Sequence, residues 1–377
     1  MCVQDGEQVA QDMENLDNRR MSWPLHCDLL HANREKASSF RTPTDQMTSE
    51  NCVPMESICE DTEFADKKQN LMNFVPSLRS GEWSHIGERP YMEDTHICIG
   101  DLAKKFGYDV HSEEAVSLYG VFDGHGGKSA AQFVRDHLPR VIVEDADFPL
   151  ELEKVVTKSF LKTDAEFEKT CSIESSQSSG TTALTAIIFG RSLLVANAGD
   201  CRAVLSRCGV AIEMSKDHRP LCIKERMRIE SLGGFIDDGY LNGQLGVTRA
   251  LGDWHLEGMK GMSGRVGPLS AEPELKLITL TKEDEFLIIG SDGIWDVFRS
   301  QNAVDYARRR LQEHNDVKQC CKELIGEAMK RGATDNLTVV MVCFHSDPPP
   351  PVVVERPRVR RSISAEGLQS LKYLLQG

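Results

Sequence analysis

Four apolar segments of this chain, each with the character of a β-strand, have an aspartate at one end. The segments with their aspartates are residues 119–122 with Asp123, 193–198 with Asp200, 286–290 with Asp292, and 337–344 with Asp335. In the first three the aspartate follows the segment, and in the fourth it precedes it. Because an antiparallel strand begins at the end where its neighbour stops, the pattern predicts that all four acids lie at one rim.

The stretch 119–127 gives the most detail about that rim. Three glycines let the backbone turn tightly around Asp123 and His125. Taken alone, an Asp-Gly pair after a strand is equally typical of a hairpin turn. The repetition of the same plan elsewhere in the chain favours a shared site over four unrelated turns.

The composition restricts the class of protein. A formal net charge of -14 argues against non-specific nucleic-acid binding and suits carboxylates gathered around cations, although solubility alone explains most such charge. With 377 residues and 40% hydrophobic side chains, the chain can bury a sizeable core. Its twelve cysteines have irregular spacings and form no Cys-x-x-Cys pair, which is typical of reduced thiols in an intracellular protein.

Targeting and membrane signals are missing from the sequence. No apolar run reaches the roughly eighteen residues of a membrane helix, and the N-terminus lacks a basic region followed by an apolar one. Residue 2 is cysteine, so the N-myristoylation signal is also missing. We therefore expect no membrane partner and a location in the cytoplasm, the nucleus or both.

The residue composition and hydrophobic periodicity along the chain predict three regions. Residues 1–78 are polar without a sustained period, and we expect a mostly disordered extension. Residues 79–346 form the expected ordered domain, with a glycine-rich appendage at about 217–267. Residues 347–377 form a basic tail, which is either a solvated end or a docking or nuclear-import segment controlled by phosphorylation of Ser362 or Ser364.

Apolar residues at helical spacing predict five helices within the domain. These are residues 128–138 with a stop at Pro139, 151–168, 223–232, 302–313 and 317–331. The strands outnumber the helices and do not alternate with them, which excludes a doubly wound parallel sheet. The predicted fold class is α+β, with packed antiparallel sheets flanked by helix pairs.

Seven motifs occur in the order known from one enzyme family. They are residues 89–94, 121–127, 179–183, 197–203, 246–253, 290–296 and 334–338. Any one of them is weak, but seven in register are specific. Over residues 80–345 the chain resembles the metal-dependent serine/threonine phosphatases of type 2C, and plant members most closely. The resemblance implies a central antiparallel β-sandwich with helices outside both sheets, a flap beside the active site, and two Mg²⁺ or Mn²⁺ ions at one end.

The resemblance also implies roles for individual residues. Asp123 would bridge the two ions, and the carbonyl of Gly124 would bind one of them. Asp292 and Asp335 would bind the other ion. Support for the first ion would come from Glu93, and less directly from Asp94. Asp200 with Asp292 would hold a weaker third ion, while Thr182, Arg249, Asp253 and Asp296 would order the ligands by hydrogen bonding.

The implied reaction needs these residue types. Mg²⁺ and Mn²⁺ are hard cations that prefer oxygen ligands, and a water shared by two ions roughly 3.5 to 4 Å apart becomes the nucleophile for in-line attack on phosphorus. Arg89 would hold the phosphate oxygens, unless it only forms a surface ion pair with Glu93 and Asp94. His125 would protonate the departing alkoxide, unless it is only a structural histidine in a glycine turn.

The sequence thus predicts a metal-dependent protein serine/threonine phosphatase in plant signalling, acting as a monomer on phosphorylated proteins. Residues 235–240 differ from the flap of the branch that acts as a hormone co-receptor in plants, so inhibition by the same receptors is not expected. Two alternatives remain open at this point. A catalytically dead binding module would normally lack a metal ligand, and a two-metal nuclease would normally carry a basic groove.

Overall fold

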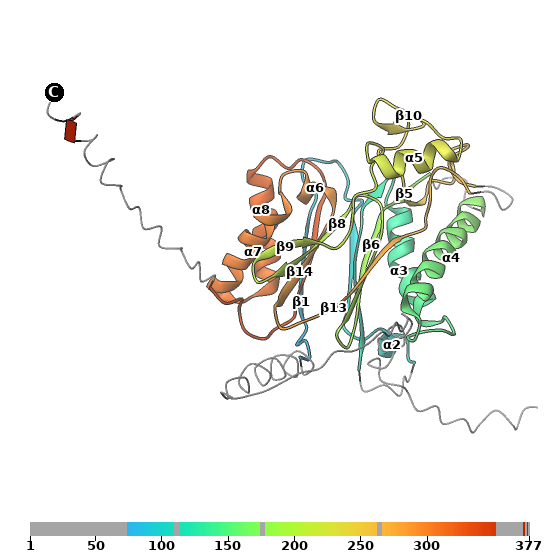
Figure 1. Cartoon of the computed structure of the whole chain (residues 1–377). Coiled ribbons are helices and arrows are strands. Elements are labelled where there is room, and N and C mark those ends of the chain that lie inside the picture. Colours follow the sequence, from blue (N-terminus) through green and yellow to red (C-terminus); the bar gives the residue numbers. More distant parts are fainter. Residues whose placement is uncertain are drawn as a thin grey trace, which may run out of the picture. The chain divides into compact units, whose positions relative to one another are not determined.

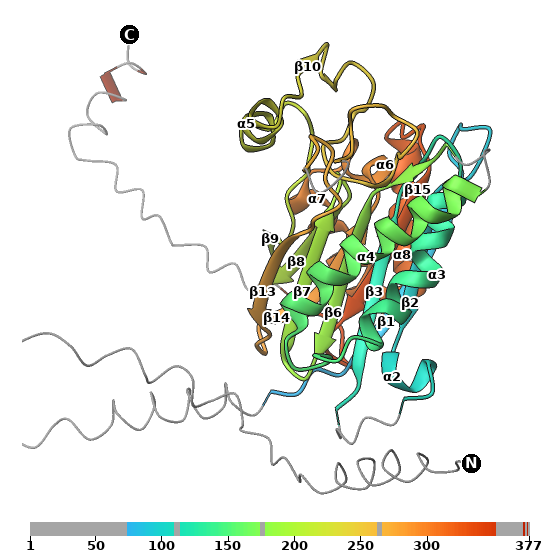
Figure 2. The same ribbon diagram turned by 90° about the vertical axis from the view of Figure 1, so that its right-hand side faces the viewer.

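The computed structural model describes residues 74–108, 114–173, 178–261 and 266–351, together with Lys372, Tyr373 and Leu375. The centre of the domain is a pair of antiparallel sheets, which Figure 1 shows nearly edge-on and Figure 2 shows after a quarter turn. In order, one sheet contains β1 (Arg79–His85), β15 (Leu337–Cys343), β14 (Asp284–Gly290), β8 (Arg202–Arg207) and β9 (Val210–Glu213). The other contains β13 (Glu274–Thr279), β7 (Ser192–Ala198), β6 (Ala183–Phe189), β3 (Val116–Phe122) and β2 (Thr95–Ile99).

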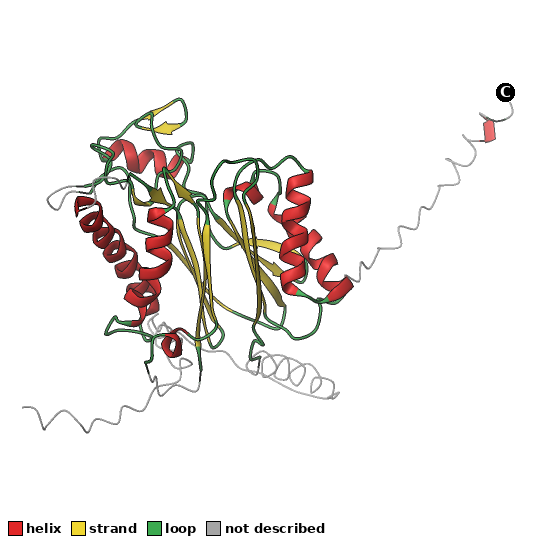
Figure 3. Cartoon of the chain, turned by 180° about the vertical axis from the view of Figure 1, so that it is seen from behind, coloured by secondary structure: helices red, strands yellow, loops and turns green. Residues whose placement is uncertain are grey.

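Helices cover the outer face of each sheet, so that the domain has four layers (Figure 3). On the first sheet lie α7 (Ser300–His314) and α8 (Val317–Lys330), and on the second lie α3 (Ser129–Val143) and α4 (Leu152–Ile173). Three apolar clusters fill the spaces, one under each helix pair and one between the sheets. The predicted α+β sandwich is therefore confirmed, and the domain buries the core that its composition allows.

Helix α3 is longer than predicted. It runs through Pro139 and ends at Val143, whereas the sequence predicts an end at Leu138. A proline inside a helix costs about 3 kcal/mol because its missing N–H removes a hydrogen bond. Ile142 and Val143 join the core under α3 and α4, and burying each contributes about 1.5–3 kcal/mol, so burial of the last turn outweighs the proline.

The other four predicted helices are confirmed, three of them within two residues at each end, whereas α4 continues to Ile173, beyond the predicted end at residue 168. They are α4, α5 (Ile223–Ser231), α7 and α8. Two one-turn helices, α2 (Leu102–Lys105) and α6 (Asp292–Trp295), were not predicted, because a single turn leaves no hydrophobic period in the sequence. Among the described residues, no helix combines the length and apolar character needed to cross a bilayer.

One end of the sandwich carries additional small elements. A short sheet joins β12 (Leu251–Gly252), β5 (Gly180–Thr181) and β4 (Gly124–His125). Beside it stands the predicted flap, containing α5 and the hairpin of β10 (Ile236–Asp237) and β11 (Tyr240–Leu241) (Figure 1). The flap has a small core of its own, in which Ile229, Leu241 and Met259 are fully buried.

A buried charge cluster fastens α5 to the rest of the flap. Both carboxylate oxygens of Glu225 accept hydrogen bonds, from Arg228 at 2.8 Å, Arg249 at 2.8 Å and Thr248 at 2.7 Å. The arginines and the threonine outweigh the burial of Glu225 and hold its pKa well below the ordinary value. Because a buried charge is costly without partners, this cluster fixes α5 relative to the segment of the flap that carries Thr248 and Arg249.

Contacts extend a few residues beyond positions 79 and 346. Phe74 and Leu78 pack against the core between the sheets. At the other end, the carbonyl of Pro350 accepts hydrogen bonds from Arg308 and, at 3.1 Å, from Gln312. The remaining expectations for the N-terminal extension, and those for Ser362 and Ser364, lie outside the described residues.

Candidate metal centre

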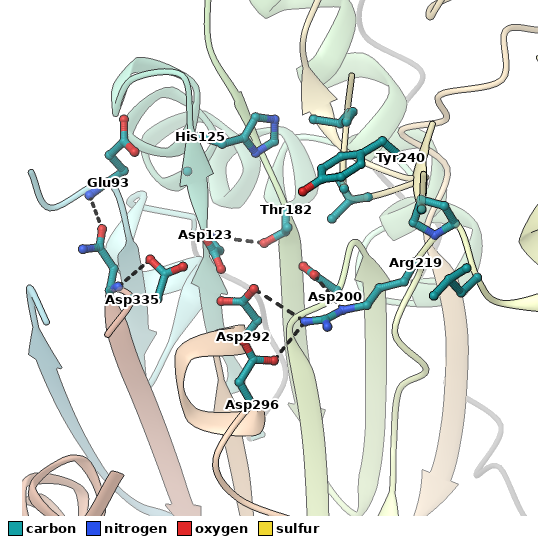
Figure 4. A pocket seen from close by; sticks show the side chains of 18 of the residues that line it. Glu93, Asp123, His125, Thr182, Asp200, Arg219, Tyr240, Asp292, Asp296 and Asp335 are labelled. Carbon is teal, nitrogen blue, oxygen red and sulfur yellow. Dashed lines mark hydrogen bonds and ion pairs between the residues drawn. The ribbon is translucent and has the colours of Figure 1, made fainter. Parts of the chain in front are cut away.

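The aspartates at the strand ends meet in one cleft beside the flap (Figure 4). Asp123 follows β3, Asp200 follows β7, and Asp292 follows β14. Each of these three offers a carboxylate oxygen within 4.8 Å of the others. Asp335, just before β15, and Glu93 line the same cleft, whose volume is about 610 Å³.

A close approach of two loops places Glu93 beside the end of β3. A β-carbon added at Gly124 would lie 2.6 Å from the carbonyl oxygen of Glu93, so only glycine fits there. On the other side, the backbone N–H of Asp123 donates to Thr182 Oγ1 at 3.1 Å, and the N–H of Thr182 donates to the Asp123 carbonyl at 2.9 Å. Thr182 therefore orders Asp123, the role that the resemblance implied for it.

Asn336 connects the fourth aspartate to the loop that carries Glu93. Its Oδ1 accepts from the N–H of Glu93 at 2.8 Å, and its Nδ2 donates to the carbonyls of Ile86 and Tyr91 at 2.8 and 3.0 Å. Arg89 on the same loop lies 2.6 Å from Asp335 Oδ2 and is more than half exposed. The structure shows an ion pair of Arg89 with Asp335, whereas the sequence analysis considered one with Glu93 and Asp94, and the guanidinium lines the cleft.

Crowding changes the protonation of the carboxylates. Burial, reinforced by the charges of neighbouring aspartates, raises the pKa of Asp123 well above its ordinary value. The same causes raise the pKa of Asp292 to about 7. Burial also raises the pKa of Asp94 to about 6, and that of Asp200 in the same direction. Like charges this close need a cation or a proton to coexist.

The residues of the centre fit Mg²⁺ or Mn²⁺. All the donors are oxygens, which these hard cations prefer, whereas the thiol of Cys201, which contacts Thr182, is buried and its pKa is raised by burial. Asp94 supplies a further indication, because it is 8% exposed and its Oδ1 has no hydrogen-bond partner within the described part of the chain. Its other oxygen accepts from Ser291 at 2.8 Å. An unpartnered buried carboxylate oxygen is costly unless a water or an ion binds it.

His125 stands at the mouth of the cleft and pairs with Asp253 from the end of β12. The distance from His125 Nε2 to Asp253 Oδ2 is 2.8 Å, and Asp253 is almost fully buried. Burial disfavours the charged imidazole, but the hydrogen bond and charge of Asp253 outweigh it and raise the pKa of His125. A protonated imidazole beside the carboxylates is suited to general-acid catalysis.

Arg219 enters the cleft from the start of the flap. Its guanidinium lies 3.0 Å from Asp200, 3.3 Å from Asp296 and 3.5 Å from Asp292. The preceding residue fixes its backbone, since the N–H of His218 donates to the Gly199 carbonyl at 2.9 Å. The sequence analysis did not single out Arg219, and its only signal there was one cation in a loop next to an acidic site.

The position of Arg249 differs from the sequence analysis, and two further residues of the cleft were not predicted. Arg249 does not lie beside the ligands as the resemblance implied, but pairs with Glu225 at 2.8 Å and donates to the Glu272 carbonyl at 2.9 Å. Leu221 and Tyr240 of the flap also line the cleft and had no predicted role. Their places depend on how the flap folds back over the sandwich, which no local pattern encodes.

Comparisons with known proteins identify the family. The family model described as Protein phosphatase 2C matches residues 84–337. "Probable protein phosphatase 2C 54" of Oryza sativa subsp. japonica is 72% identical over 324 residues, which cover 85% of this chain and 89% of the relative. "Probable protein phosphatase 2C 22" of Arabidopsis thaliana is 59% identical over 326 residues, covering 86% of this chain and 83% of the relative.

Solved structures share the fold. The crystal structure of the serine-threonine phosphatase 2C from Toxoplasma gondii aligns with a TM-score of 0.60 at 21% identity, covering 72% of this chain and 98% of that chain. At that identity the likeness concerns the fold alone, and the family model and the plant relatives carry the assignment. The chain belongs to the plant protein phosphatase 2C family, a family of serine/threonine protein phosphatases.

Proposed function

We propose that this chain hydrolyses phosphoserine and phosphothreonine on proteins with the help of two Mg²⁺ or Mn²⁺ ions. The observation that carries the proposal is the cluster of Asp123, Asp200 and Asp292, whose oxygens lie within 4.8 Å of one another at the strand ends. The carboxyl pKa values in this cluster, raised by burial and by the neighbouring aspartates, add support, because a bound cation stabilises the charged carboxylates. The rice and Arabidopsis relatives are themselves named probable protein phosphatases, and a role in plant signalling is part of this proposal.

The ligands proposed for the two ions are oxygens of five residues in the cleft. Asp123 would bridge the ions, the carbonyl of Gly124 and the carboxylate of Glu93 would complete one side, and Asp292 and Asp335 the other. Asp200 would share a weaker third ion with Asp292, and Asp94 would support the ligands through its unpartnered Oδ1. All of these residues line the cleft or lie directly behind it.

The chemistry supplied by two bound metal ions would be a water molecule of lowered pKa, aligned for in-line attack on phosphorus. Arg89 is exposed and faces the cleft, so its planar fork can hold two phosphate oxygens. His125, whose pKa is raised by the hydrogen bond and charge of Asp253 in spite of burial, can donate a proton to the departing serine or threonine oxygen. The carboxylates bind metal rather than phosphorus, so no covalent enzyme intermediate is needed.

The test is turnover of a phosphothreonine peptide by the full chain with Mn²⁺, Mg²⁺ or EDTA. We expect hydrolysis with either cation and silence in EDTA, restored when cation is added back. Turnover that continues in EDTA would contradict the metal requirement. Parallel assays with single-stranded and duplex DNA address the nuclease alternative, and cleavage of DNA without hydrolysis of the peptide would replace the proposed function.

A further inference from the structure

The two walls of the cleft differ in chemistry. One wall carries the aspartates together with Glu93 and Arg89, as Figure 4 shows for Glu93 and Asp335. The opposite wall comes from the flap and, apart from Arg219, presents apolar and aromatic side chains and backbone. Those side chains belong to Pro220, Leu221, Tyr240, Leu245 and Val247.

Two members of this wall are large and exposed. Leu221 is 78% exposed and Tyr240 is 49% exposed. Single exposed apolar residues are common on protein surfaces, so exposure alone indicates nothing. These two, however, line the same cleft as the carboxylates, and the flap has a closed apolar core of its own to which other side chains are committed. They are therefore available to a ligand that enters the cleft.

The cleft has free space beside the flap wall. A β-carbon built on Gly239 meets no atom within 4 Å, and one built on Gly246 meets only Tyr240 Cε1, at 3.9 Å. Both glycines line the cleft. With a volume of about 610 Å³, the cleft can hold more than a phosphate group, since small-molecule sites span about 300–1,000 Å³.

The wall is also held in a fixed place. Leu241, next to Tyr240, is fully buried, and its N–H donates to the carbonyl of Leu245 at 2.7 Å. The Glu225 cluster fastens α5, which begins two residues after Leu221. A preformed surface loses less entropy when it binds than a loop that must first become ordered.

We infer that the flap wall of Leu221 and Tyr240 is a specificity subsite for a large apolar side chain adjacent to the phosphorylated residue of the substrate. This inference rests on the proposed function, because the carboxylate centre fixes where the phosphate lies. An apolar neighbour buries Leu221 and one face of the Tyr240 ring, whereas a polar neighbour loses water there without gaining a partner.

The test uses phosphothreonine peptides of one common sequence, with leucine or asparagine immediately before or immediately after the phosphothreonine. For the wild-type chain with Mn²⁺, we expect kcat/KM to be about fivefold or more higher for leucine than for asparagine at one of these positions. In the double variant Leu221→Asn, Tyr240→Ser, the ratio should fall below about twofold. Each single variant should give an intermediate ratio.

The matched control is Val210→Ser on β9, which removes a 59% exposed apolar side chain that does not line the cleft. This variant should keep the wild-type ratio. A wild-type ratio near one at both positions, or a preference that survives the double substitution, would overturn the subsite. If no peptide is hydrolysed with either cation, the proposed function itself fails, so the two failures are distinguishable.

Discussion

Arg219 Nε lies 3.0 Å from Asp200 Oδ2, and the same guanidinium lies 3.5 Å from Asp292. Arg219 therefore occupies the carboxylates that the proposed third ion would need. We expect Arg219→Ala to lower the dissociation constant of the weakest Mn²⁺ by about two- to fivefold, since a partly exposed cation of this kind contributes about 1 kcal/mol or less. Calorimetric titration with Mn²⁺ measures this directly, without reference to turnover.

The control for that substitution is Arg226→Ala, which removes a flap arginine that pairs with Glu230 along α5, at 2.8 Å, and does not line the cleft. Its Mn²⁺ titration should match the wild type. Weaker binding of Mn²⁺ by Arg219→Ala would show that the arginine orders the carboxylates for the ion and does not compete with it.

Asp292→Asn tests the centre in two opposite ways. The loss of one ligand charge should reduce turnover with Mn²⁺ by about tenfold or more, which is ~1.4 kcal/mol of barrier. In EDTA, however, the same variant should be more stable than the wild type near neutral pH, because it relieves repulsion among the aspartates. Thermal melts with and without Mn²⁺ separate the two effects.

The sign of the pH dependence follows from the raised carboxyl pKa values. The pKa of Asp292 is about 7 and that of Asp94 about 6, both above their ordinary range. A carboxyl whose folded pKa is raised stabilises the fold while it is protonated, and this contribution is lost as the pH rises through the folded pKa. In EDTA the wild-type Tm should therefore fall between about pH 5 and pH 8, and the fall should be smaller in Asp292→Asn. An equal fall in both proteins would contradict the assignment.

Asp253→Asn tests how His125 is kept charged. Because Asp253 holds the pKa of His125 above its ordinary value, the imidazole stays protonated to a higher pH than it would alone. A general acid is lost as the pH rises through its pKa, so the alkaline limb of the rate profile should move to lower pH in the variant. Asparagine suits the site sterically, since Asp253 has φ 59 and asparagine tolerates this left-handed region.

A test of His125 as the general acid needs a substrate with a poor leaving group. A phosphopeptide requires a proton on its departing oxygen, whereas an activated aryl phosphate does not. His125→Ala should therefore reduce turnover of the phosphopeptide more than that of the aryl phosphate. Equal losses on both substrates would indicate a structural role for His125.

The aspartates at the strand ends could be predicted from the sequence because each lies next to its strand in the chain. Antiparallel pairing puts Asp292 and Asp335 at one end of one sheet, and Asp123 and Asp200 at one end of the other. The packing of the two sheets then brings these ends together in the cleft. The end of α3 could not be predicted from the sequence. The cost of Pro139 depends on the helix alone, whereas the burial of Ile142 depends on the sheet beneath the helix.

The flap wall could not be predicted for a related reason. Leu221, Tyr240 and Arg219 reach the cleft because a separate small core and the Glu225 cluster bend the chain back over the sandwich. The residues of that cluster are up to 24 positions apart, and their pairing has no periodicity in the sequence. The motif at 246–253 placed Arg249 among the ligands by resemblance, whereas its side chain binds Glu225.

Glu225→Gln tests whether the flap and the carboxylate centre are separate parts. The variant keeps the shape of the side chain but removes the charge that pairs with Arg228 and Arg249, both largely buried. Removing one partner of a buried ion pair costs about 3–5 kcal/mol, and partial exposure of the arginines places this site at the lower end. We expect a lower Tm and a reduced kcat/KM for a leucine-containing phosphopeptide, because the flap wall loses its fixed position. Turnover of a small aryl phosphate, which needs only the carboxylates and Arg89, should change much less. Equal losses on the two substrates, measured below the lowered Tm, would show that the cluster supports the centre itself.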